Sequence, residues 1–125
     1  MPIRGIRGAV TAKADDPEAI LSATRELLMA IMEANPSLRS DDIASAFFTV
    51  TEDILSAYPA KAARKSLGWE HVPMLCAREI PVPGGPPHCI RVLIHWNTGL
   101  PQLEIRHVYL GDAVKLRPDL QQADF

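Results

Sequence analysis

Arg91 stands where a charged side chain is least expected, in the middle of an apolar strand. Residues 89–96 read Cys-Ile-Arg-Val-Leu-Ile-His-Trp, between a segment rich in proline and glycine and an Asn-Thr-Gly turn, which predicts a β-strand. Alternation places Ile90, Val92, Ile94 and Trp96 on one face and Arg91 on the other, between Cys89 and Leu93. A cation there is costly to desolvate unless an anion meets it. Periodicity alone favours a structural carboxylate over a bound ligand as that anion.

Other cations also lie on largely apolar elements, namely Arg7, Lys61, Arg64 and Arg117, together with the carboxylate Glu79 and the phenol Tyr109. Arginine binds a carboxylate through two parallel hydrogen bonds, so such a set suits a small polyanion. Solvated surface is the competing interpretation. In that interpretation Arg7 lies on a solvent-exposed edge strand over residues 3–11. The solvent-exposed face of a short helix then carries Lys61, Arg64 and Lys65.

Several common catalytic patterns are missing from the sequence. The four histidines and two cysteines lack the spacing of a zinc site, and there is no GxSxG motif. The glycines match neither a Walker loop nor a dinucleotide fingerprint. A Cys76–His pair for nucleophilic catalysis stays open, although nothing local supports it.

Composition predicts one globular domain over residues 1–125, with 47% hydrophobic and 22% charged residues. The net charge of −2 gives no support for a nucleic-acid or anionic-membrane partner. No apolar run approaches the roughly 20 residues that span a bilayer. Without a secretory signal, Cys76 and Cys89 read as reduced thiols, and we expect a cytoplasmic protein.

The hydrophobic periods predict alternating strands and helices that must position these residues. A long helix runs from Asp16-Pro17 to Asn35-Pro36, and a short helix occupies residues 60–68. The remaining expected elements are strands at 3–11, 46–51, within 72–80, at 89–96 and within 105–110, helical turns at 40–42 and 51–57, and a mobile tail over 112–125.

Six stretches of the chain occur together in one known family. They are IRGIRGA at 3–9, PAKAAR at 59–64, Val72-Pro73 with Cys76 and Glu79, CIRV at 89–92, IRHVYL at 105–110 and LRPDL at 116–120. In this order and spacing the chain closely resembles the monofunctional chorismate mutases of the AroH class, nearly from end to end.

The resemblance implies an α/β (α+β) fold, a mixed β-sheet with helices in a pseudo-α/β-barrel homotrimer. It also implies active sites at subunit interfaces, where Arg7 and Arg91 face a neighbour's segment 58–64. The implied reaction is the Claisen rearrangement of chorismate to prephenate on the way to phenylalanine and tyrosine. That reaction is unimolecular and needs no metal and no cofactor.

The resemblance also implies a role for each site residue. Arg91 would face the ether oxygen of the substrate, Glu79 would take the ring hydroxyl with Cys76 near it, and Arg7 and Tyr109 would hold the side-chain carboxylate. Lys61, Arg64 and Arg117 would bind the second carboxylate or close the site. The apolar walls would be formed by Tyr58, Ala60, Met74, Leu75 and Leu116. Tyr58 stands where the family more often has Phe, and Leu75 where some members have Thr; both affect the wall and not the charges.

Two other functions use the same cations. One is a noncatalytic trimer that binds small carboxylates. The other is an imine or enamine deaminase like those of the YjgF/RidA family, whose fold is similar. A cation aimed at an ether oxygen, as the resemblance implies for Arg91 beside Glu79, disfavours the binding protein.

Overall fold

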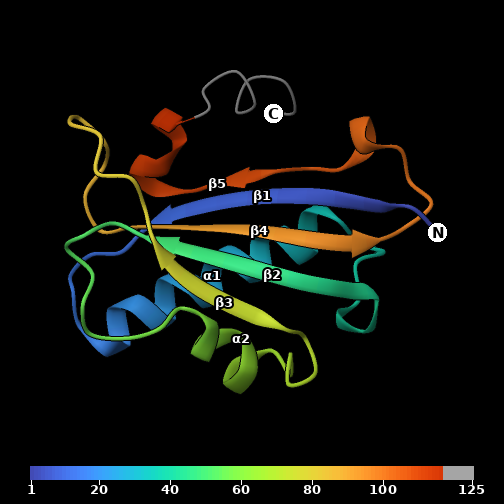
Figure 1. The fold of residues 1–125 in the computed structure, drawn as a ribbon, viewed down its shortest axis with the longest axis horizontal. Coiled ribbons are helices and arrows are strands. Elements are labelled where there is room, and N and C mark those ends of the chain that lie inside the picture. Colours follow the sequence, from blue (N-terminus) through green and yellow to red (C-terminus); the bar gives the residue numbers. More distant parts are fainter. Residues whose placement is uncertain (117–125) are drawn as a thin grey trace.

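A five-stranded mixed sheet forms the centre of the molecule (Figure 1). The computed structural model describes residues 1–116. The strand order is β3-β2-β4-β1-β5, and β4 is antiparallel to both of its neighbours. The outer pairs, β2 with β3 and β1 with β5, are parallel. The strands are β1 (Ile3–Thr11), β2 (Ile43–Val50), β3 (Met74–Arg78), β4 (Cys89–Asn97) and β5 (Val108–Tyr109).

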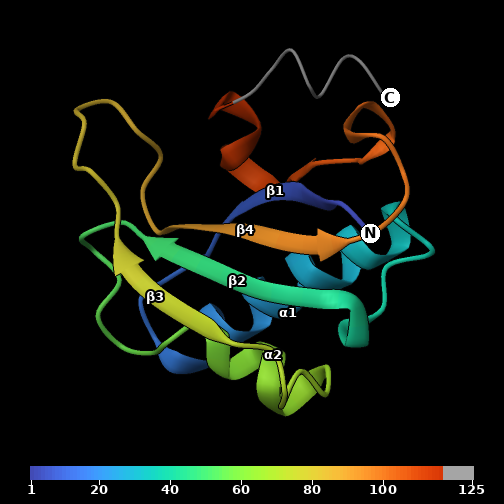
Figure 2. The ribbon, with the colours of Figure 1, turned by 45° about the vertical axis from the view of Figure 1, so that its right-hand side comes forward.

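Two α-helices, α1 (Pro17–Ala34) and α2 (Ala60–Ser66), cover the same face of the sheet. In Figure 1 α1 lies behind the strands and α2 below β3, and in Figure 2 both lie below the sheet. The Asp16 side chain caps α1 by accepting a hydrogen bond from Ala19 N at 2.8 Å, as the Asp-Pro sequence predicts. Residues 1–116 also contain three short 3₁₀ helices: η1 (Ser40–Asp42), η2 (Gln102–Glu104) and η3 (Gly111–Leu116).

The core lies between the helices and the covered face of the sheet. Ile90, Val92, Ile94 and Trp96 of β4 are all buried there, which confirms the alternation predicted for this strand. Leu27, Leu28 and Ile31 of α1 pack against the same core. Apolar burial on this face is the main driving force for the fold.

Neither α-helix covers the opposite face of the sheet; among residues 1–116, η3 packs there against Ala9 and Tyr109, at the side of β1 and β5. Leu75, Phe47 and Leu93 are paired across β3, β2 and β4, and their side chains are 64%, 42% and 37% exposed. Arg7 of β1 lies next in the same row, opposite Leu93. These four residues are the open row of the sheet, and three of them are large apolar side chains in contact with water.

Three sequence predictions need correction. β2 begins at Ile43, three residues earlier than predicted. β1 is not an edge strand, because β5 pairs with it at Gly8 and Ala9. The helical turn predicted over 51–57 is wrong, since that segment forms turns and bends.

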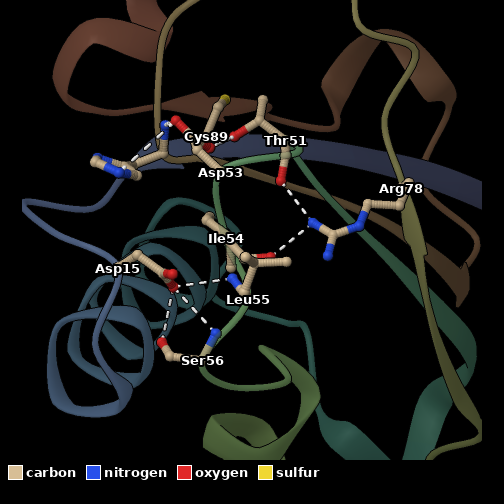
Figure 3. Close-up of polar contacts among 9 residues, drawn as sticks. Asp15, Thr51, Asp53, Ile54, Leu55, Ser56, Arg78 and Cys89 are labelled. Carbon is tan, nitrogen blue, oxygen red and sulfur yellow. Dashed lines mark hydrogen bonds and ion pairs between the residues drawn. The ribbon is translucent and has the colours of Figure 1, made fainter.

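Side chains from elsewhere explain why residues 51–57 do not form a helix (Figure 3). Asp15 accepts hydrogen bonds from Leu55 N, Ser56 N and the Ser56 hydroxyl. Arg78 donates to the carbonyl oxygens of Thr51 and Ile54 at 2.9 and 2.6 Å. These tertiary partners take backbone groups that a helix would pair internally.

The predicted C-terminal tail begins in an ordered position. Residues 112–116 belong to η3, in which Ala113 is fully buried. Arg117 and the rest of the tail lie outside the described residues, and mobility there stays a prediction.

The start of β4 is held by a small polar cluster. His88 has φ of +50°, a left-handed conformation that is uncommon for residues other than glycine. Its backbone N–H donates to Asp53 at 2.9 Å, and the next N–H, of Cys89, donates to the Thr51 hydroxyl at 3.0 Å. The Thr51 hydroxyl in turn donates to Asp53 (Figure 3). The cluster fixes the conformation of the chain two residues before Arg91.

Replacement of Gly8 tests how closely β1 approaches α1. A Cβ atom on Gly8 would lie 2.7 Å from Ile31 Cδ1 and 3.2 Å from the Val108 carbonyl oxygen. We expect Gly8→Ala to lower the free energy of unfolding by about 1–3 kcal/mol because the core is overpacked. Urea denaturation measures this. Gly5→Ala is the matched control on the same strand, since its Cβ would meet Leu93 at 3.6 Å, an ordinary contact. Equal effects at the two positions would contradict the close approach.

The charge of Asp53 makes the β4 cluster sensitive to pH. Burial raises the pKa of this carboxyl, but hydrogen bonds from Thr51 and from the His88 N–H outweigh burial and hold the pKa below the ordinary 3.8. A lowered folded-state pKa stabilises the fold above pH 3.8, and that stabilisation is lost as the pH falls through the folded-state pKa. We expect Asp53→Ala to lower the melting temperature near neutral pH and to match the parent well below pH 3.8.

Thermal unfolding at several pH values measures the difference, and Asp41→Ala, an exposed position in η1, is the control. A parent–variant gap that stays constant down to the lowest pH would show that the charge of Asp53 is not responsible.

Candidate active site

Arg91 lies in a row of side chains that crosses the whole open face of the sheet. The strand register pairs Arg91 with Thr49 on one side and Ala9 on the other. Beyond them come Ala77 of β3 and Tyr109 of β5. Ala9 is fully buried in a cluster with Tyr109 and Ala113, while Thr49 places a hydroxyl beside the guanidinium.

Glu79, the residue after β3, supplies the anion for Arg91. Its Oε2 lies 3.3 Å from Arg91 Nε and accepts a hydrogen bond from the Thr49 hydroxyl at 2.9 Å. Its Oε1 accepts from Ile80 N at 3.2 Å. The side chains of Arg91 and Glu79 are 43% and 26% exposed, so the ion pair is partly desolvated in this chain. The structural carboxylate that periodicity favoured is confirmed.

A cavity of about 700 Å³ opens beside this ion pair. Its walls include Arg91, Glu79, Cys89, Leu116 and the segment 80–87. This volume is within the usual range for small-molecule sites. The same cation therefore has both a partner on its own chain and a space where a ligand anion can reach it.

Cys89 lies deep in this cavity, 3% exposed, in a small cluster with Ala9, Tyr109 and Ala113. Burial raises the pKa of its thiol, and the charge of Arg91 and a hydrogen bond with it act in the opposite direction. The thiol is therefore neutral at neutral pH and forms a compact wall of the cavity. Strand alternation predicts Cys89 on the same face as Arg91, but neither its spacing nor the family resemblance indicated a place in the site.

A second cavity of about 350 Å³ lies near α2. Tyr58 and Cys76 line it, with Arg78 and the segment 54–57. Tyr58 is 73% exposed, and Lys61 and Arg64 are exposed on α2 without lining either cavity.

The structure separates the residues predicted for one site into two groups. Arg91, Glu79 and Leu116 line the first cavity, and Tyr58 and Cys76 line the second. Tyr109 is buried beside the first cavity, with Leu116 packed against its cluster. The other predicted residues lie elsewhere: Arg7 is in the open row, Ala60 is buried in α2, and Met74 and Leu75 are on β3.

Three further residues of the first cavity region escaped sequence analysis. Thr51 and Asp53 line the cavity, and Thr49 contacts Glu79. The signal that could have found Thr49 is the pairing of β2 with β4, which aligns it with Arg91. Sequence periodicity identifies strands and their faces but leaves the register between distant strands open.

Within residues 1–116, no group of three or more His, Cys, Asp or Glu side chains is arranged to hold a metal ion. The helices in that range also include none that is long and apolar enough to cross a membrane.

Comparisons with known proteins identify the family of the chain. The sequence model of the family described as chorismate mutase type I matches residues 3–120. The chorismate mutase AroH of Thermus thermophilus is 57% identical over 121 residues, which cover 97% of this chain and 98% of that protein. The corresponding AroH of Bacillus subtilis (strain 168) is 46% identical over 120 residues, 96% of this chain and 94% of that protein.

A solved structure of a chorismate mutase from Clostridium thermocellum superposes with a TM-score of 0.81 at 44% identity, covering 85% of this chain and 93% of that one. The sheet, its covering helices and the sequence identity along nearly the whole chain lead to one conclusion: this chain belongs to the type I, AroH-class, chorismate mutase family.

Proposed function

We propose that this protein is an isomerase that converts chorismate to prephenate, a step in the synthesis of phenylalanine and tyrosine. The observation that carries the proposal is the guanidinium of Arg91 in the wall of the 700 Å³ cavity, with Glu79 beside it. Chorismate carries two carboxylates, a ring hydroxyl and an ether oxygen, and each has a complementary group among the residues near this cavity or on the exposed side of α2.

The reaction requires that the substrate be held in one conformation and that its developing charge be stabilised. It requires no proton transfer. Binding must hold the enolpyruvyl group over the ring, which removes the entropic cost of reaching that conformer. As the ether C–O bond breaks, negative charge grows on the oxygen. A fixed cation there stabilises the transition state more than the substrate, and only such differential binding raises the rate. Arg91 is that cation in our proposal.

The remaining roles follow from position and charge. Glu79 receives the ring hydroxyl, since a carboxylate with about four acceptor sites has capacity beyond Thr49, Arg91 and Ile80. Arg7 and Tyr109 bind the side-chain carboxylate. Leu116, with Ala60, Met74, Leu75 and Tyr58, forms apolar wall, and Cys76 lies near the hydroxyl. Lys61, Arg64 and Arg117 serve the second carboxylate or closure of the site.

We infer that the active protein is a cytoplasmic homotrimer whose sites lie between subunits. Two observations support this assembly. The residues assigned to one site are divided between two cavities of the same chain. A second copy must therefore bring its Tyr58 and Cys76 to the cavity that Arg91 lines. The open row exposes Leu75, Phe47 and Leu93, an apolar surface that association would bury.

Removal of the Arg91 charge tests the proposed function. We expect Arg91→Ala to lower kcat for chorismate by about 10²–10³ or more, the usual cost of losing one donor to a developing oxyanion, with a smaller change in KM. Loss of chorismate absorbance with appearance of prephenate measures the rate. Arg25→Ala, on the exposed side of α1, is the control.

The outcomes of this assay separate the candidate functions. If Arg91→Ala converted chorismate at the parent rate, Arg91 would not be the cation that stabilises the ether oxygen. A parent protein that binds small dicarboxylates but leaves chorismate unchanged would instead be the noncatalytic binding trimer. Ammonia release from an imine substrate would indicate a deaminase of the YjgF/RidA kind.

A charge in the open row tests the assembly. We expect the parent to have a solution mass of three times 13.7 kDa, or about 41 kDa. Phe47→Asp places a carboxylate in the apolar surface and should shift the protein to monomers, because an unpaired charge is costly to bury. Light scattering gives the mass, and activity should fall with it.

Leu103→Asp is the control, since Leu103 is 98% exposed in η2, away from the open row. A monomeric parent with full activity would contradict a shared site.

A further inference from the structure

Thr49 touches the central ion pair, yet the proposed reaction gives it no task. It lies on β2 between Arg91 of β4 and Ala77 of β3 and is half-buried. Its hydroxyl donates to Glu79 Oε2 at 2.9 Å, the same oxygen that lies 3.3 Å from Arg91 Nε. A β-branched residue in a strand has a restricted χ1 angle, so this hydroxyl is held in place.

Both carboxylate oxygens of Glu79 accept hydrogen bonds from other groups of the chain. Oε1 is occupied by Ile80 N at 3.2 Å, and Oε2 by Thr49. The ion pair then uses Nε, the inner nitrogen of Arg91. A carboxylate without these restraints commonly turns to form a two-pronged pair with a guanidinium, through two parallel hydrogen bonds. Such a pair would occupy more of the donors of Arg91 and neutralise its charge more completely.

We propose that Thr49 is a positioning residue that keeps Glu79 on the Nε side of Arg91. The N–H groups of Arg91 that neither Glu79 nor Cys89 occupies then stay available to the cavity, and its charge stays available to the breaking ether bond. Thr49 acts through Glu79 and does not touch the substrate. This inference rests on the proposed mutase activity for its kinetic consequence, but the orientation of Glu79 does not depend on that activity.

Thr49→Val removes the hydroxyl and keeps the shape and strand preference of the side chain. We expect kcat for chorismate to fall by about tenfold or more, in line with the loss of a hydrogen bond to a charged group. KM should stay within about threefold, because the transition state is affected more than binding. Thr49→Ser, which keeps the hydroxyl, should recover most of the lost kcat.

Ser45→Ala is the matched control. Ser45 lies on the same strand, and its hydroxyl contacts His95 Nδ1 at 3.0 Å, away from the ion pair. Its removal should leave kcat at the parent value. Equal losses from Thr49→Val and Ser45→Ala would point to a general weakening of β2 and would overturn the inference.

A double-mutant cycle distinguishes positioning from simple support of the fold. In a Glu79→Gln background, Thr49→Val should produce little further loss of kcat, because the group that Thr49 restrains no longer carries the competing charge. Fully additive losses would show that Thr49 acts independently of Glu79 and would overturn the inference.

A crystal structure of Thr49→Val gives a readout that needs no activity. The carboxylate of Glu79 should turn from Nε toward the terminal nitrogens of Arg91. If the parent protein had no mutase activity, the proposed function would be refuted. The crystal structure of Thr49→Val would still test whether Thr49 restrains Glu79. An unchanged Glu79 in Thr49→Val, or a Thr49→Val variant with parent kcat, would show that Thr49 does not position the pair.

Discussion

A guanidinium on the central strand of a sheet is the constraint around which this molecule is built. Arg91 belongs to a strand whose other face is the core, so its backbone cannot move without disturbing Ile90 and Val92. A cation fixed in this way needs an anion nearby, and Glu79 provides it from the end of β3, two strands away. The parallel pairing of β2 with β3 thus positions Glu79 relative to Arg91.

The open face of the sheet adds a second constraint. Charged and hydroxyl groups occupy the row through Arg91, while the next row presents Leu75, Phe47 and Leu93 to water. Within residues 1–116, no helix covers the apolar row, while η3 packs on the other row at Ala9 and Tyr109 and leaves Arg91 partly exposed. Covering the apolar row with other subunits would bring a neighbour close to the charged row, so burial of apolar surface and completion of the site are favoured by the same association.

Sequence reasoning succeeded where structure depends on local pattern. The alternation of residues 89–96, the cap at Asp16 and the helix ending before Gly68 all follow from neighbouring residues, and the structure confirms them. It failed over 51–57, because Asp15 and Arg78 reach that segment from distant parts of the chain. It also placed Arg7 on an edge strand, since β5 is only two residues long and gives a weak signal. The site residues came mainly from family resemblance, and Thr49 required the register of strands β2 and β4.

The end of β3 links the two cavities of one chain. Arg78 and Glu79 are consecutive, and an extended chain directs consecutive side chains to opposite sides. Arg78 lines the second cavity and holds the carbonyl oxygens of Thr51 and Ile54, while Glu79 lines the first and pairs with Arg91. Thr51 in turn receives the N–H of Cys89 at the start of the Arg91 strand. These hydrogen bonds therefore connect the wall of the second cavity to the start of the strand that carries Arg91.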